Sequence, residues 1–183
     1  LCRTEDVKSE NIIEEYNWVS AAEFLDSLGI DIISTSLGYV DFDNPQWDHV
    51  YSDLDGETSV ITFGSEIACS RGILCVTSAG NEGETSFPYI SVPADGENVL
   101  TVGAVDKYGD KASFSSIGPT YDNRIKPDVM AHGYNVTVAA TWGNGYADGS
   151  GTSFSCPVLA GMAACLWQAN KHLPASAIRD ALR

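Results

Sequence analysis

A serine at the start of a predicted helix is the residue of this sequence best placed to do chemistry. Gly151, Thr152 and Ser153 form a small polar turn that runs into VLAGMAACLWQA, whose apolar residues recur at helical spacing. The first N–H groups of a helix lack partners inside it and the helix dipole is positive there, so an oxyanion is stabilised. A hydroxyl beside such donors suits nucleophilic attack on a carbonyl. The alternative role for Ser153 is an ordinary helix N-cap.

The elements that must position this serine alternate as strands and helices, which favours a parallel sheet covered on both faces. We expect helices over residues 9–28, 58–70, 151–170 and 174–182, and strands over residues 30–36, 73–78, 99–105 and 136–140. Sites in such sheets form beyond the carboxyl ends of the strands. Two polar segments, Ser36-Leu37-Gly38 and Gly80-Asn81, follow predicted strands and therefore fall at that edge.

The first helix is predicted from apolar residues that recur at a spacing of three to four, which places them on one buried face. These residues are Ile12, Tyr16, Val19, Ala22 and Leu25. Ser9 is the predicted N-cap, and Gly29 stands where a glycine commonly ends a helix.

Composition places the chain among acidic globular proteins. Its 183 residues are 44% hydrophobic, enough for one domain with a core. Ten Lys and Arg stand against 25 Asp and Glu, and the net charge of −15 argues against nucleic acid or an anionic membrane surface as partner. No apolar run reaches the roughly 20 residues that span a bilayer. We expect an extracytoplasmic protein, either secreted, periplasmic or in the cell envelope.

The five cysteines cannot all pair within one chain because their number is odd. They are Cys2, Cys69, Cys75, Cys156 and Cys165. No two are spaced as C-x-x-C, so a zinc site is not indicated. The last four lie in predicted apolar helices or a strand, and we expect buried free thiols there.

An acidic loop, residues 39–57, follows the strand at 30–36. Its carboxylates are Asp41, Asp43, Asp48, Asp53, Asp55 and Glu57. An EF-hand is excluded, because acidic residues do not recur at the required spacing from Asp53 and Asp55. A solvated loop is the simpler interpretation, and a calcium site of another kind stays open.

The string GTSFSCPVLAG resembles the nucleophile motif GTSxxxPxxxG of the subtilisin-like serine proteases, the subtilases. The resemblance implies that Ser153 is the catalytic nucleophile and that the fold is a three-layer α/β/α with a mostly parallel sheet. FSSIGP at 114–119 and KPDVMAHG at 126–133 are similar to structural segments of the same family. The similarity runs through essentially all of the chain, and the opening stretch most resembles bacterial cell-envelope members.

Two further segments carry the implied site. DIISTSLGY resembles the strand of the family that pairs with the substrate backbone, an example of β-addition. SAGNEG resembles the oxyanion segment, which implies that the Asn81 side chain donates to the tetrahedral oxyanion. The implied substrate-binding residues are Ser36, Leu37, Gly38, Ser78, Ala79 and Gly80. By the same resemblance, a cis bond is expected at Val92–Pro93 beside the pocket.

The aspartate and histidine motifs of the family, D-[ST]-G and H-G-T-H, are absent. None of His49, His132 and His172 stands in the family context, so we interpret them as structural or surface residues. The resemblance then implies the C-terminal portion of a catalytic domain, without its N-terminal strands, whose Asp and His lie outside this chain. Without its neighbour, strand 30–36 would be an open edge that self-associates.

The leading hypothesis is a serine endopeptidase that cleaves polypeptides through Ser153 and Asn81 without a cofactor. The chain alone would be inactive or nearly so, because triad members are missing. The alternative is a pseudoprotease, a peptide-binding module without catalysis. A serine hydrolase with a lysine base has little support, because no lysine lies near Ser153 in the sequence.

Overall fold

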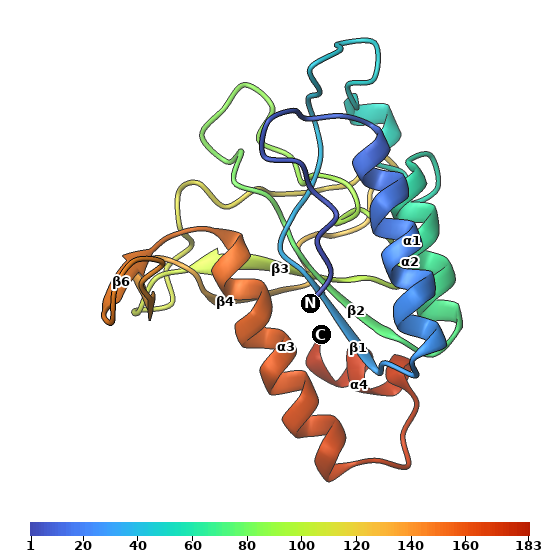
Figure 1. The fold of residues 1–183 in the computed structure, drawn as a ribbon, viewed down its shortest axis with the longest axis vertical. Coiled ribbons are helices and arrows are strands. Elements are labelled where there is room, and N and C mark those ends of the chain that lie inside the picture. The colour runs from blue at the N-terminus through green and yellow to red at the C-terminus, as the bar shows by residue number, and fades with distance from the viewer.

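The computed structural model describes all residues from Leu1 to Arg183. Four parallel strands form the central sheet in the order β1-β2-β3-β4. They are β1 (Ile32–Thr35), β2 (Leu74–Ser78), β3 (Leu100–Val105) and β4 (Val129–His132). One face is covered by α1 (Ile13–Ser27) and α2 (Val60–Ser70), the other by α3 (Thr152–Ala169) and α4 (Ala175–Leu182) (Figure 1). The predicted three-layer α/β/α fold is confirmed.

The sheet divides the core into two apolar clusters. A cluster of 15 buried residues, including Trp18 and Ile61, lies on the side of α1 and α2. A second cluster of 10, including Cys156 and Leu159, lies on the side of α3 and α4. Strand β2 is buried along its whole length, because it has a strand on each side and helices on both faces. Strand β1 pairs only with β2 and is therefore an edge strand.

Helix α1 begins later than predicted, and Ser9 is not its cap. The helix starts at Ile13, and its N-cap residue makes no capping bond through a side chain. The Glu14 carboxylate accepts the N–H groups of Asp6 (2.6 Å) and Asn11 (3.2 Å) instead. A glutamate in the first turn whose side chain accepts backbone N–H groups before the helix stabilises the helix start, as a capping residue does. The helix ends just before Gly29, whose φ is 74°, as predicted.

The buried face of α1 also differs from the prediction. Tyr16 is 51% exposed, whereas Glu15 and Trp18 are buried. Glu15 is buried because its carboxylate bonds to His49 from the acidic loop and accepts the N–H of Ile61 in α2. Apolar spacing along one helix contains no information about such distant partners.

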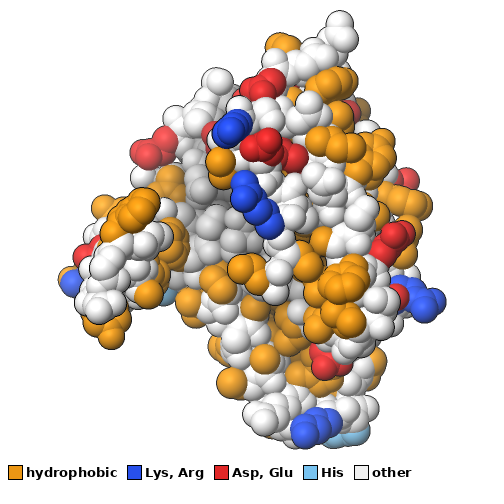
Figure 2. All heavy atoms as spheres, in the orientation of Figure 1, with side chains coloured by type: hydrophobic (Ala, Val, Ile, Leu, Met, Phe, Trp, Pro, Cys, Tyr) orange, Lys and Arg blue, Asp and Glu red, His pale blue; other side chains and the backbone are white.

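The sequence does not predict β4, and it places the strand at 136–140 in the wrong sheet. β4 is short and only partly buried, so it lacks a continuous apolar run. Residues Val136–Ala139 form β5, which pairs antiparallel with β6 (Tyr146–Gly149) in a separate hairpin that projects from the body (Figure 1). Hydrophobic side chains gather on this projection (Figure 2), where Trp142 and Tyr146 are strongly exposed.

All five cysteines are free, and the four that were expected to be buried free thiols are not all buried. Cys75 and Cys156 are buried, and Cys69 is partly buried. Cys165 is exposed, so its predicted burial is wrong. Helix α3 packs on the sheet with one face only, and Cys165 lies outside that face.

The remaining short helix is a 3-10 turn at Tyr51–Asp53 within the acidic loop. Helix α2 begins with the capping bond that its sequence favours, because the Ser59 hydroxyl accepts the N–H of Thr62 at 3.2 Å. Helix α2 packs against α1 and on β2.

Candidate active site

The carboxyl ends of β1 and β2 meet the start of α3 at one edge of the sheet. Ser36 follows β1, Asn81 follows β2, and Ser153 is in the first turn of α3. The pocket between these elements has a volume of about 560 Å³. The predicted site residues that line it are Leu37, Gly38, Ser78, Gly80, Asn81 and Ser153. Ala79 is fully buried and does not line it, and Ser36 bonds to Ser153 directly.

Two reciprocal hydrogen bonds hold Ser153 against the end of β1. Its hydroxyl donates to the Ser36 carbonyl (3.3 Å), and the Ser36 hydroxyl donates to the Ser153 carbonyl (2.9 Å). Because Ser153 lies in the first turn of α3, its backbone N–H has no acceptor within the helix, and it has none elsewhere in the chain. The hydroxyl thus lies beside a free donor at the positive end of a helix.

Thr152 fixes the orientation of the Asn81 side chain. Asn81 Oδ1 accepts the Thr152 N–H (2.9 Å) and the Thr152 hydroxyl (3.1 Å). A backbone N–H can only donate, so the amide oxygen must face it and the Nδ2 group is left without an acceptor in the protein. Asn81 Nδ2 and the Ser153 N–H are therefore two free donors near one hydroxyl, an arrangement that can stabilise an oxyanion. Thr152 belongs to the Gly-Thr-Ser string, but its contact with Asn81, 71 residues away, cannot be read from that string.

Two glycines line the pocket because a side chain would not fit there. A Cβ on Gly38 would lie 2.1 Å from Ser91 Oγ, and a Cβ on Gly80 would lie 2.9 Å from Ser116 Oγ. Gly80 also has a φ of +104°, which disfavours any other residue. The backbone N–H and carbonyl of Gly38 have no partner in the chain, so an extended peptide can add to this segment.

The predicted cis bond at Val92–Pro93 is confirmed. Tyr39, the residue after Gly38, exchanges backbone hydrogen bonds with Val92 at 3.0 and 3.2 Å. This pairing fixes the segment after β1 at the wall of the pocket. The bonds at Gly118–Pro119 and Lys126–Pro127 are also cis.

No histidine and no lysine forms a hydrogen bond with the Ser153 side chain. His49 Nε2 lies 2.5 Å from the Glu15 carboxylate. His132 ends β4, and its Nε2 is buried without a partner. His172 is exposed in the turn after α3, and Ser153 lies at the opposite end of this 18-residue helix, which is about 27 Å long. The geometry agrees with the interpretation of these histidines as structural or surface residues.

Three carboxylates of the acidic loop bond to the backbone of the loop itself. Asp48, Asp53 and Asp55 each accept N–H groups of their own loop. These bonds stabilise turns within the loop.

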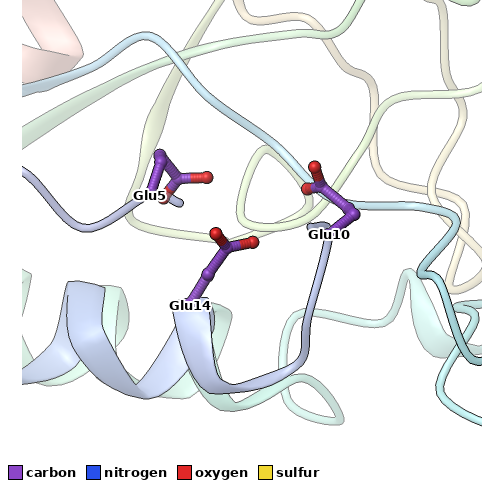
Figure 3. A group of neighbouring side chains, drawn as sticks. All are labelled: Glu5, Glu10 and Glu14. Carbon is purple, nitrogen blue, oxygen red and sulfur yellow. The ribbon is translucent and has the colours of Figure 1, made fainter. Parts of the chain in front are cut away.

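Three carboxylates outside that loop do lie together, those of Glu5, Glu10 and Glu14 (Figure 3). One oxygen of each lies within 4.8 Å of the others. Both Glu14 oxygens already accept N–H groups, and Glu5 Oε1 accepts the Tyr39 hydroxyl. Calcium takes six to eight oxygen ligands, so a calcium ion here would need further oxygens from the backbone or from water.

Three further carboxylates, which were not among the predicted site residues, line the pocket. They belong to Glu10, Asp41 and Glu82. Burial raises the pKa of Glu10, and the nearby carboxylates of Glu14, Glu5 and Asp43 raise it further. Glu82 directly follows Asn81, so its position could have been found from the sequence. Glu10 could not, because it reaches the pocket only through the folding of the chain before α1.

The fold and the pocket together define a three-layer α/β protein with a serine and an asparagine at the carboxyl edge of a parallel sheet. The sequence profile described as "Subtilase family" matches residues 1–183, and the chain belongs to this family.

Relatives and solved structures agree with this assignment. The chain is 33% identical to serine protease AprX of Bacillus subtilis (strain 168), covering 94% of this chain and 42% of the relative. It is 35% identical to subtilisin DY of Bacillus licheniformis, and the match covers 90% of this chain and 52% of that relative. The structure of the self-cleaved protease domain of PatA superposes on this chain with a TM-score of 0.72 and 26% sequence identity. The superposition covers 91% of this chain and 57% of the PatA domain. The chain spans about half the length of the curated relatives it matches.

Proposed function

We propose that the chain is the nucleophile-bearing part of a serine endopeptidase. Ser153 Oγ attacks the carbonyl carbon of a peptide bond, and its proton passes to a general base and then to the leaving amine. Water hydrolyses the resulting acyl-enzyme. The Ser153 N–H and Asn81 Nδ2 stabilise the oxyanion in both steps. The observation that carries this proposal is the pair of free donors beside one serine hydroxyl.

The proposed substrate is a polypeptide bound in extended form along Ser36-Leu37-Gly38. The unpaired backbone of Gly38 supports this, because it offers the hydrogen bonds of a strand edge. In this proposal Ser78 and Gly80 shape the wall that receives a side chain next to the cleaved bond, and Ala79, which is fully buried behind them, does not contact the peptide.

The general base and its orienting acid are, in this proposal, a His and an Asp outside these 183 residues. The absence of any histidine bonded to Ser153 supports this, as does the half-length coverage of the relatives. Residues 1–183 then form one unit, the C-terminal portion of a larger catalytic domain, and are inactive or nearly so alone. No metal or other cofactor takes part.

A second candidate is a pseudoprotease that binds peptides without cleaving them. The same absence of a base near Ser153 favours it, since the pocket and the open backbone of Gly38 need no catalysis to bind a chain.

The proposed location is outside the cytoplasm, in a secreted, periplasmic or cell-envelope protein. The strongly acidic composition and the likeness to bacterial subtilisins support this. No helix has both the length and the apolar content needed to cross a membrane.

Covalent labelling by a fluorophosphonate tests the proposed function. We expect Ser153 to be labelled when residues 1–183 are part of the full-length gene product, and labelling of the isolated 183 residues to be weak or absent. The reason is that the hydroxyl needs a base to be activated. Intact-protein mass spectrometry measures the adduct, and Ser153→Ala in the full-length product is the control.

Each outcome distinguishes the candidates. Labelling of neither form would contradict the endopeptidase and favour the pseudoprotease. Strong labelling of the isolated chain would show that a base lies within it, and His49 and His132 would then be replaced first.

We also propose that the isolated chain self-associates through the segment 30–36. Strand β1 has no neighbour on its outer side, and unpaired edges recruit other strands. We expect sedimentation velocity to show dimers or larger species, and Ser34→Lys, which puts a charge on this edge, to shift the chain to monomer. Thr137→Lys on β5 is the matched control and should leave the association unchanged. A monodisperse unmodified monomer would contradict the prediction.

A further inference from the structure

The pocket at Ser153 is lined by acidic side chains and by no basic ones. Glu10, Asp41 and Glu82 are among its 15 lining residues, and none of the 15 is Lys, Arg or His. None of the three carboxylates takes part in any of the seven ion pairs of the molecule. Their charges are therefore not neutralised by the protein itself. We call these three residues the acidic wall.

The acidic wall extends along the path proposed for the peptide. Asp41 lies five residues after Ser36 on the segment that leaves β1, so the two are at most roughly 17 Å apart. Glu10 is joined to the same segment, because Asp43 N–H donates to the Glu10 carbonyl (2.9 Å) and Glu10 N–H donates to an Asp43 carboxylate oxygen (3.2 Å). Glu82 adjoins Asn81. A bound peptide would thus pass carboxylates over about five residues.

Other carboxylates surround Glu10, so a cation bound beside it would be stabilised by several negative charges. Its carboxylate lies with those of Glu5 and Glu14 (Figure 3). Burial and these like charges raise the pKa of Glu10, because the charged form is disfavoured until an opposite charge arrives. A guanidinium or ammonium group at the end of a long side chain needs no complete coordination shell and can pair with one or two carboxylates.

We propose that the acidic wall selects peptides that carry Lys or Arg within about five residues of the bond at Ser153. This inference rests on the proposed function, since it assumes that a peptide lies in the pocket. It adds the substrate class, namely cationic polypeptides, and the residues that recognise them.

Binding of matched peptides tests the proposal without any need for catalysis. All proteins carry Ser153→Ala, and the probes are two eight-residue fluorescent peptides that differ only in Arg against its neutral isostere citrulline. We expect the Arg peptide to bind about tenfold more tightly at low salt, with the difference screened at high salt. In Glu10→Gln/Asp41→Asn this ratio should fall close to one. The control Glu57→Gln/Asp110→Asn has the same net charge, changes exposed residues outside the pocket and should keep the wild-type ratio.

Fluorescence anisotropy measures the affinity of each protein for the Arg and the citrulline peptide, and hence the ratio of the two. Equal affinity for the two peptides, or no binding of either, would overturn the proposal even if Ser153 is labelled in the full-length protein. A ratio that falls equally in the control pair would show a general charge effect and would overturn it too. Loss of the preference at equimolar Ca²⁺ would show that the carboxylates hold the metal instead.

The pH dependence is a further arm of the same experiment. Protonation removes the charge of Glu10, and its raised pKa means that a proton binds at a higher pH than to an ordinary glutamate. The Arg preference should therefore be complete near neutral pH and begin to fall, on acidification, above the usual titration range of a glutamate. A preference that does not change down to that range would contradict a role for Glu10.

Discussion

Replacing Asn81 by alanine is expected to slow the reaction of Ser153 by about 10² to 10³-fold, the cost known for one such donor in a related protease. Asn81 Oδ1 is held by the N–H and hydroxyl of Thr152, so Nδ2 is already oriented before substrate arrives. Its removal leaves the oxyanion with the Ser153 N–H alone. The second-order rate constant of fluorophosphonate labelling in the full-length protein measures the loss.

Two variants sharpen this result. Asn81→Asp keeps the shape of the side chain but cannot donate, so it should be at least as slow as Asn81→Ala. Asn144→Ala, in the exposed turn of the β5–β6 hairpin, should react at the wild-type rate. An Asn81→Ala protein that is labelled at the wild-type rate would remove Asn81 from the proposed mechanism.

Replacing Glu15 by alanine is expected to destabilise the fold by about 3–5 kcal/mol. Glu15 is fully buried, and its carboxylate bonds to His49 Nε2 (2.5 Å) and to the N–H of Ile61 (3.0 Å). Alanine leaves both partners inside the protein without an acceptor. The midpoint of thermal unfolding should fall by roughly 10 °C, as circular dichroism or calorimetry would measure.

The matched control lies on the same helix. Glu23 is exposed on α1, and Glu23→Ala should change the free energy of unfolding by less than about 0.5 kcal/mol. If Glu15→Ala were as mild as Glu23→Ala, the bonds from α1 to the acidic loop and α2 would contribute little to stability.

The parts of the fold that the sequence predicts are those with local signals. Strands β1, β2 and β3 follow from short β-branched and apolar runs, and α3 follows from helical spacing after Gly151. The meeting of Ser153, Asn81 and Ser36 at one edge follows from a property of all parallel sheets, because their strands end on the same side.

The parts that escape prediction depend on partners distant in sequence. The burial of Glu15 requires His49, 34 residues away. The placement of β5 depends on β6 rather than on its own residues. The acidic wall assembles from the chain before α1, the loop after β1 and the turn after β2, so no single stretch of sequence contains it.

The order of the strands has a consequence for synthesis on the ribosome. In space the strands of the sheet follow the same order as in the chain, so each can join the edge left by the one before as it emerges. Helix α3 contacts all four strands and comes after them. Its arrival covers the second face of the sheet and brings Ser153 to Ser36 in the same event. Ser153 is therefore placed beside Ser36 only after all four strands of the sheet have been synthesised.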